Sequence, residues 1–132
     1  MSYQPIVTPI AERQLSKLAK SEPDVALAAM RLILGLRENP WLGEEMRERP
    51  RLPSLSDCRR IRFDREDYKG KPRYRLVYRN EPADGAPHVV AVLSVDVREQ
   101  LRAYSVAAKS RAERLRELRG AIHKRQRPPF DR

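Results

Sequence analysis

Three short stretches decide the fold: CRRIRFD at residues 58–64, RYRLVYR at 73–79 and HVVAVLSV at 88–95. In the first two, basic and apolar residues alternate, which is the period of a β-strand with one buried face. The third is almost entirely apolar, as expected of a central strand that is covered on both faces. Turn residues such as Gly70 and Pro72 separate the stretches. The sequence therefore predicts an antiparallel meander of three strands.

A short strand and a helix are predicted at the N-terminus. Residues 4–8 favour a strand, which Pro5 confines to a sheet edge or a strand start because proline lacks a backbone N–H. Thr8 and Pro9 then read as the N-cap and first residue of a helix, because a threonine hydroxyl caps free N–H groups and proline has helical φ. The expected apolar stripe of this helix comprises Ile10, Ala11, Leu15 and Leu18.

A second helix follows, and the two should form a hairpin. Ser21 is its expected N-cap, with Pro23 in the first turn, and the helix should stop before Asn39. Residues 40–56 contain prolines and no clean period, so they read as a long connection. We expect Trp41 and Leu42 to pack this connection onto the core. The expected apolar stripe of the second helix comprises Val25, Ala28, Leu32 and Leu36.

Beyond Val95 the pattern becomes helical again. Apolar residues recur about every seven positions, which predicts an amphipathic helix of about six turns with a largely arginine outer face. The last residues, 126–132, should fray. We divide the chain into a domain at 1–108 and a basic helical extension at 109–132, with an α+β fold in which the helix hairpin packs on a small antiparallel sheet. The stripe of the long helix comprises Leu101, Tyr104, Ala108, Leu115, Leu118 and Ile122.

Positive charge is concentrated in the second part of the chain. The formal net charge is +10, yet residues 1–50 carry seven basic and seven acidic side chains. Residues 51–108 carry twelve basic and eight acidic side chains, and residues 109–132 carry nine and three. This asymmetry favours a polyanionic partner, because neutralising phosphates releases counterions. The alternative is a solvated arginine-rich surface without a nucleic-acid partner.

Several classes of protein are disfavoured. No run approaches the roughly 20 apolar residues of a transmembrane helix, and the N-terminus lacks the pattern of a signal peptide. Cys58 is the only cysteine, which excludes an internal disulfide and a Cys-cluster zinc site. We therefore expect a cytoplasmic protein without a cofactor, a bound metal or a membrane partner, and we interpret Cys58 as a small buried residue.

The strand pattern predicts a cluster of arginines. Alternation places Arg60 and Arg62 on one face of their strand. It also places Arg73, Arg75 and Arg79 on one face of the next strand. Arginine forks bind phosphate oxygens in pairs, and a tyrosine ring can stack on an unpaired base. Arg98, just after the third strand, and Tyr104, at the start of the long helix, would join this surface if the faces coincide.

An ordered set of motifs resembles the RelE-like branch of the RelE/ParE toxin superfamily of toxin-antitoxin systems. The set consists of DCRRIRF at 57–63, YRLVY at 74–78, VLSV at 92–95 and Arg98-Glu99 with Tyr104 six residues further on. The order of helix hairpin, meander and C-terminal helix fits as well. The resemblance covers roughly residues 4–110.

The resemblance implies a toxin that inhibits translation: a metal-independent endoribonuclease that enters the ribosomal A site and cleaves mRNA. The cut would arise from attack of a ribose 2′-OH on the adjacent phosphate. By position, Arg75 matches the arginine that steadies the phosphate charge, Arg98 the one that helps the leaving oxygen, and Tyr104 the tyrosine that orients the nucleotide. Arg62 stands among the basic residues that contact and activate RNA. The expected RNA-binding residues are Arg60, Arg73, Arg79 and Lys109.

One departure concerns the general base. The family often has lysine where this chain has Arg60 and Arg62, and an arginine, with a pKa above about 12, hardly gives up its proton. We favour a protein that only positions the RNA and stabilises charge. The other candidates for the base are Asp64, Asp96, His88 and Tyr104.

Each candidate also has a structural interpretation. Arg60 and Arg62 can pair with Asp64, Glu66 or Asp67 on a solvated edge. Arg75 can form a structural salt bridge, Arg98 and Glu99 can cap the adjoining helix, Tyr104 can belong to the core, and His88 can be a surface residue. The basic C-terminal residues can form a solvated helix face, or they can bind rRNA or an acidic antitoxin segment.

Three functions stay open at this point. The first is a ribonuclease toxin, with the ribosome and mRNA as targets and a cognate antitoxin as partner in a hetero-oligomer. The second is a ParE-like toxin that inhibits DNA gyrase. The third is a non-catalytic relative that binds RNA or a protein. The cluster of Arg60, Arg62, Arg75, Arg98 and Tyr104 favours the first.

Overall fold

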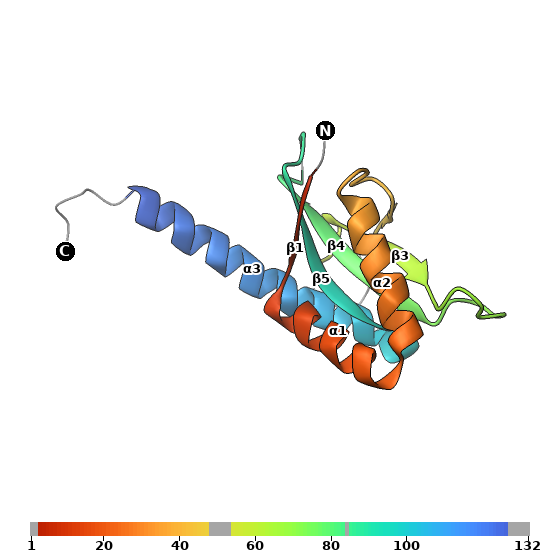
Figure 1. Ribbon diagram of the computed structural model, residues 1–132. Coiled ribbons are helices and arrows are strands. Elements are labelled where there is room, and N and C mark those ends of the chain that lie inside the picture. The colour runs from red at the N-terminus through yellow and green to blue at the C-terminus, as the bar shows by residue number, and fades with distance from the viewer. Residues whose placement is uncertain (1–2, 48–53, 84, 127–132) are drawn as a thin grey trace.

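A computed structural model describes residues 3–47, 54–83 and 85–126. The fold is α+β, with helices packed on a five-stranded mixed sheet of order β1-β5-β4-β3-β2 (Figure 1). The elements are β1 (Gln4–Val7), α1 (Pro9–Ser21), α2 (Pro23–Leu36), β2 (Glu44–Glu45), β3 (Cys58–Phe63), β4 (Tyr74–Glu81), β5 (Val89–Val97), the 3₁₀ turn η1 (Glu99–Leu101) and α3 (Arg102–Gln126).

The predicted meander is confirmed, and the sheet has two further strands. β3, β4 and β5 pair antiparallel in sequence order, with Arg62 opposite Arg75 and Arg75 opposite Asp96. β1 is an edge strand, as Pro5 requires, and it runs parallel to β5, so the sheet is mixed although the predicted meander within it is antiparallel. The two-residue strand β2 pairs with β3 inside the predicted connection.

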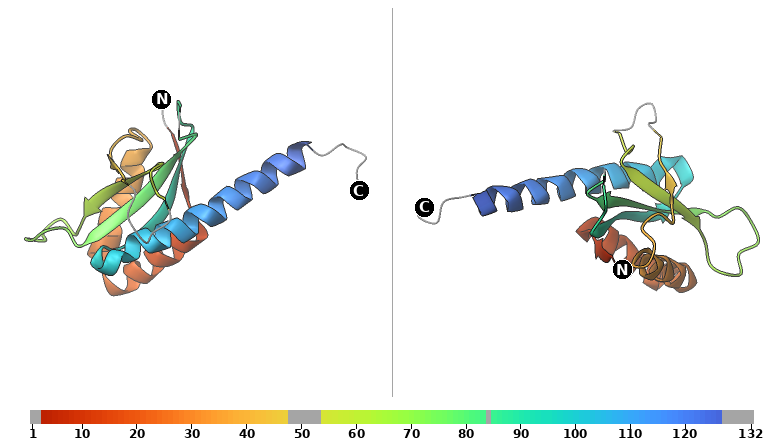
Figure 2. Two further views of the ribbon diagram at one scale, coloured as in Figure 1. Left: turned by 180° about the vertical axis from the view of Figure 1, so that it is seen from behind. Right: turned by 90° about the horizontal axis from the view of Figure 1, so that it is seen from above.

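Helices cover both faces of the sheet. α1 and α2 lie on one face and α3 lies on the other, as the view from above in Figure 2 shows. Alternation along each strand supplies both layers, because neighbouring side chains point to opposite faces. The core under α1 and α2 includes Phe63, Tyr74, Leu76, Tyr78, Val90, Val92 and Val95. The core under α3 includes Cys58, Val77, Ala91, Leu93, Tyr104 and Ala107.

The start of α1 matches the prediction, and the start of α2 does not. The Thr8 side chain accepts a hydrogen bond from the Ala11 backbone N–H, with Pro9 as the first helical residue. Ser21 does not cap α2, because α1 runs on to this residue and its hydroxyl donates to the Lys17 carbonyl. The N-cap of α2 is Glu22, whose side chain makes no capping hydrogen bond.

The buried face of α2 is rotated relative to the predicted stripe. Ala28 and Leu32 are only half-buried, and the buried residues are Val25, Ala26, Ala29, Ile33 and Leu36. α2 is apolar nearly all round, so apolar spacing alone did not identify the face that packs. Trp41 and Leu42 are each 48% exposed, so they do not pack onto the core as expected. Instead, the guanidinium of Arg59 lies 5.4 Å from the centre of the Trp41 ring.

α3 packs on the sheet with its first part, and its C-terminal part projects beyond the sheet (Figure 1). Its buried residues are Ala103, Tyr104, Ala107 and Ser110, while Leu115 and Leu118 of the predicted stripe are half-buried. Small residues let the helix approach the strands closely. Of the segment 126–132 that was predicted to fray, Gln126 is the last residue of α3, and residues 127–132 lie outside the described part, as does the side chain of Ile122. The division of the chain at residue 108 stays a prediction, because α3 runs through this position without a break.

Candidate nucleic-acid interface

Arginines from two strands gather on the face of the sheet that α3 covers in part. Arg60 and Arg62 alternate with Ile61 and Phe63 along β3, so both point to the α3 side. Arg75 of β4 lies directly opposite Arg62 in the strand register. These three arginines are called the arginine cluster below. Strand alternation, which the sequence predicts, acts together with the strand register to bring these arginines to one place.

Tyr104 of α3 joins the arginine cluster from above the sheet. Its ring is fully buried in the core under α3. Its hydroxyl accepts a hydrogen bond of 3.2 Å from Nη1 of Arg60, and it is also hydrogen-bonded to Arg75. A fully buried ring cannot stack on a base in this conformation. Tyr104 therefore contributes its hydroxyl, which fixes the positions of two guanidinium groups.

Arg75 is the most constrained member of the arginine cluster. Nη1 donates hydrogen bonds of 2.9 Å to the backbone carbonyls of Pro72 and Tyr74. The pKa of Arg75 lies below its ordinary value, because burial disfavours the charged form and Arg62 and Arg60 add like charge, although the Tyr104 hydroxyl acts in the other direction. Bringing three like charges together costs free energy, so the site is prepared to gain from an incoming anion.

The arginine cluster has little carboxylate compensation within the described part of the chain. Arg60 has one remote partner, the exposed Glu44, at 3.9 Å. Neither Arg62 nor Arg75 forms an ion pair with any described residue. The Nε atoms of Arg60 and Arg75 are buried and make no hydrogen bond there either. Hydrogen-bond donors with unspent capacity beside a positive field suit a phosphate group.

The other predicted site residues lie outside the arginine cluster. Arg98 is exposed just beyond β5, at the end of the sheet where Arg75 lies, and its backbone N–H donates to the Arg73 carbonyl. The Arg73 side chain forms a two-point pair with Asp64 at 2.9 Å and stacks on Tyr68 at 4.1 Å. Lys109 is exposed on α3.

Arg79 belongs to a separate ion-pair network that fastens α3 to the sheet. Asp57 receives Arg79 at 2.8 Å and Arg111 at 2.7 Å, and Glu81 receives Arg114 at 2.8 Å. Burial alone would raise the pKa of Asp57, but the hydrogen bonds and charges of Arg111 and Arg79 outweigh it and hold that pKa well below its ordinary value. This network was not predictable from the sequence, because no local pattern pairs Asp57 with residues 22 and 54 positions away.

Of the candidate bases, Tyr104 contacts the arginine cluster, whereas Asp64 and Asp96 are paired with other residues and His88 lies elsewhere. Burial would raise the pKa of Asp64, but hydrogen bonds from Arg73 and the Arg65 backbone lower it to about 2, so it stays ionised and paired. Asp96 accepts hydrogen bonds from Gln14 and the Val97 backbone and pairs with Arg102 at 3.1 Å. His88 lies exposed at the opposite end of β5 from Asp96.

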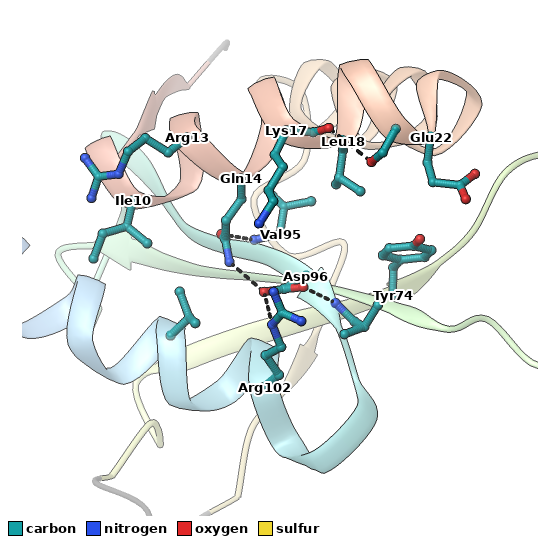
Figure 3. A pocket seen from close by; sticks show the side chains of 13 residues that line it. Ile10, Arg13, Gln14, Lys17, Leu18, Glu22, Tyr74, Val95, Asp96 and Arg102 are labelled. Atoms are coloured by element: carbon teal, nitrogen blue, oxygen red, sulfur yellow. Dashed lines mark hydrogen bonds and ion pairs between the residues drawn. The ribbon is translucent and has the colours of Figure 1, made fainter.

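A cavity of about 410 Å³ lies at the edge of β5, away from the arginine cluster (Figure 3). β1 pairs with β5 only as far as Val92, and the Gln14 side chain then takes the place of a strand by accepting a hydrogen bond from the Val95 N–H at 2.8 Å. Figure 3 shows Gln14 and Arg102 converging on Asp96 across the floor of this cavity. Of the candidate site residues predicted from the sequence, only Asp96, a candidate base, lines it; none of the predicted arginines, Tyr104 or Lys109 does.

Among the described residues, no group of three or more His, Cys, Asp or Glu side chains lies close enough to hold a metal ion. No helix in that part is long and apolar enough to cross a membrane. Cys58 is buried, and burial together with the charge of Asp57 raises the pKa of its thiol, which leaves it protonated at neutral pH.

Two solved structures resemble this chain. A double arginine-to-alanine mutant of the Escherichia coli toxin RelE in the free state superposes with a TM-score of 0.57 at 26% identity, over 83% of this chain and 97% of that one. The RelBE2 toxin-antitoxin complex from Mycobacterium tuberculosis contains a chain that superposes with a TM-score of 0.52 at 26% identity, over 74% of this chain and 100% of its own length. No family model and no curated protein matches the sequence.

The fold and the structural matches define the class of protein. The chain has the RelE-like toxin fold, which confirms the resemblance drawn from its sequence motifs. This similarity supports a toxin of a toxin-antitoxin system, and the solved complex supports an antitoxin as its partner.

Proposed function

We propose that this chain is a ribosome-dependent mRNA endonuclease that inhibits translation by cutting mRNA in the A site. The observation that carries the proposal is the arginine cluster: Arg60, Arg62 and Arg75 converge from two strands, and among the described residues only the exposed Glu44, 3.9 Å from Arg60, forms an ion pair with them. A cluster of this kind suits a phosphate that gains negative charge in the transition state. The fold, shared with RelE toxins, supports the same function.

The proposed reaction needs only the RNA itself as reactant. The ribose 2′-oxygen attacks the adjacent phosphorus, the bond from phosphorus to the 5′-oxygen breaks, and a 2′,3′-cyclic phosphate and a 5′-hydroxyl form. The proton of the 2′-OH passes to solvent, and the 5′-oxygen takes up a proton. Arg62 and Arg75 stabilise the charge on the phosphate oxygens, and Arg98, at the same end of the sheet, would lie near the leaving oxygen.

The paired state of the candidate bases favours catalysis by positioning and charge. Asp64 and Asp96 are each held by an arginine, and His88 lies at the far end of β5. We infer that Arg60 and Tyr104 act by positioning: the Tyr104 hydroxyl holds Arg60 and Arg75 in place. The pH profile of the activity should then lack the inflection near the pKa of a carboxylate or an imidazole that such a base would give.

Toeprinting of ribosomes translating a defined message tests the proposal. Added wild-type protein should produce cuts within the A-site codon. Arg62→Ala and Arg75→Ala should each slow cutting by about 100-fold or more, the usual cost of removing one charge-stabilising group. The matched control is Arg37→Ala, which removes an exposed arginine at the end of α2 and should cut at the wild-type rate.

The other outcomes separate the rival functions. Uncut message together with relaxed plasmid DNA in a gyrase supercoiling assay would replace the ribonuclease with a gyrase inhibitor. Uncut message and normal supercoiling, with RNA still retained by the protein, would leave a non-catalytic binder. Equal slowing by Arg37→Ala and Arg75→Ala would show that net charge, and not the arginine cluster, governs cutting.

A further inference from the structure

Basic side chains of α3 between residues 109 and 119 divide into two sets with different directions. Arg111 and Arg114 turn toward the sheet, where they pair with Asp57 and Glu81 at 2.7 and 2.8 Å. These two arginines are half-buried. They fasten the helix to the body, so their charges are already neutralised and are not available to a partner.

The second set points outward. Lys109, Arg116 and Arg119 are exposed, and none of them forms an ion pair with a residue in the described ranges. Lys109 and Arg116 are seven residues apart, which is close to two helical turns or about 10 Å along the axis, and Arg119 continues the same side one turn later. We call these three residues the α3 stripe.

The surroundings of the α3 stripe argue against a protein as its partner. Ala112, which lies between its members, and Ser105, one turn before Lys109, are exposed and small. Protein interfaces depend on buried aromatic or large apolar anchors, and this face offers none among its described positions. Phosphate contacts need only charge and reach, and they bind without regard to base sequence.

The position of the α3 stripe suits an elongated polyanion. The C-terminal part of α3 projects away from the sheet (Figures 1 and 2), and the three residues of the α3 stripe are exposed. The two solved toxins match 83% and 74% of this chain, so part of this chain has no counterpart in them. A-form RNA presents its phosphates along a wide, shallow minor groove that a helix can approach from outside.

We propose that the α3 stripe binds the phosphate backbone of double-helical RNA independently of sequence. The inference deepens the proposed function and rests on it for its biological setting: the arginine cluster would hold the strand that is cut, while the α3 stripe holds a neighbouring RNA duplex. The two surfaces share no residue, so each can be removed without the other.

Fluorescence anisotropy of a labelled 20-base-pair RNA duplex of random sequence tests the inference with the full-length protein. The test variant is Lys109→Gln/Arg116→Gln/Arg119→Gln. The matched control is Arg13→Gln/Lys17→Gln/Lys20→Gln, which removes three exposed charges from one side of α1. The α3 variant should bind at least tenfold more weakly at 0.1 M salt, and the slope of log K against log salt concentration should fall by about 2 to 3. The α1 variant should keep the wild-type slope.

Each alternative result overturns the inference. Equal losses in the two variants would mean that net charge alone binds the duplex. An unchanged slope in the α3 variant, with circular dichroism showing an intact fold, would exclude these residues from the contact. Poly-glutamate of equal charge binding as tightly as the duplex, with the same loss in the α3 variant, would assign the surface to an acidic protein segment.

The proposed nuclease activity and the proposed duplex binding are tested by different results. A protein that binds the duplex through the α3 stripe but leaves A-site codons intact would keep the inference and remove the nuclease. Arg37→Ala, the control of the cutting assay, should keep the wild-type affinity for the duplex, because Arg37 is an exposed residue at the end of α2 and not on α3.

Discussion

Replacing Tyr104 by Phe removes one oxygen atom from the centre of the arginine cluster and leaves the buried ring in place. The hydroxyl accepts from Arg60 at 3.2 Å and is hydrogen-bonded to Arg75. A hydrogen bond to a charged group contributes about 1.5–3 kcal/mol. The bond to Arg60 is long, and water can reach part of each guanidinium, so we expect the variant to lose about 1–2 kcal/mol of unfolding free energy.

The same change should slow RNA cutting by about tenfold, which corresponds to about 1.4 kcal/mol of lost transition-state stabilisation. The reason is positional: without the hydroxyl, Arg60 and Arg75 lose their common partner and occupy more rotamers. Urea denaturation measures the first effect and single-turnover cutting on ribosomes measures the second. A phenyl ring stacks as well as a phenol ring, so a stacking role predicts no loss of cutting. Wild-type stability and cutting in Tyr104→Phe would refute the positioning role, and a changed pH profile would assign proton transfer to the hydroxyl instead.

Further predictions concern stability. Asp57→Asn should lose about 2 kcal/mol at pH 7 in urea denaturation, because it leaves the half-buried Arg111 without its carboxylate and Arg79 with only the longer pair to Glu81 at 3.5 Å. The control Glu45→Gln, an 83% exposed partner, should lose less than about 1 kcal/mol. The folded-state pKa of Asp57 lies below its unfolded value, so its contribution to the free energy of unfolding is complete above about pH 4 and is lost as the pH falls further. The difference in unfolding free energy between wild type and Asp57→Asn should therefore shrink below about pH 4. A difference that stays constant with pH would contradict the pairing. Gly43→Ala should lose about 1–3 kcal/mol, because the new Cβ would stand 2.8 Å from a backbone carbonyl oxygen and 2.9 Å from a buried tyrosine ring, and an unchanged melting temperature would contradict this packing.

The sequence predicted the meander because its strands obey a local rule. Alternation placed Arg60 and Arg62 on one face of β3 and Arg75 on one face of β4, and the register then brings the two faces to the same side of the sheet. The Thr8 cap was predictable for the same reason, since one side chain and the following turn decide it.

Features that depend on distant residues were not predictable in this way. The parallel pairing of β1 with β5 joins segments about 85 residues apart, and the hydroxyl contact of Tyr104 depends on how α3 crosses the sheet. The rotated face of α2 follows from the same limit, because a helix that is apolar on all sides packs with the face that its neighbours offer. Local pattern therefore placed the arginines, and tertiary packing decided which of them meet.

Three of the predicted site arginines differ in whether a carboxylate neutralises their charge. Arg73 and Arg79 satisfy their charge on Asp64 and Asp57, whereas Arg98 is exposed with no ion pair in the described part of the chain. A paired arginine offers little to an incoming phosphate, because binding it would first require breaking the existing pair. We therefore expect Arg62 and Arg75 to dominate contact with the RNA, with Arg98 secondary.

The most direct test of the arginine cluster is a titration of the arginine side-chain Nε–H signals by nitrogen-15 NMR. The ligand is a single-stranded trinucleotide with a 2′-O-methyl group at the position of attack, which binds but cannot be cut. The signals of Arg62 and Arg75 should shift first and furthest, followed by that of Arg60, while those of Arg73 and Arg79 should stay in place. Equal shifts at all five arginines, or shifts confined to Arg73 and Arg79, would contradict a phosphate site at the arginine cluster.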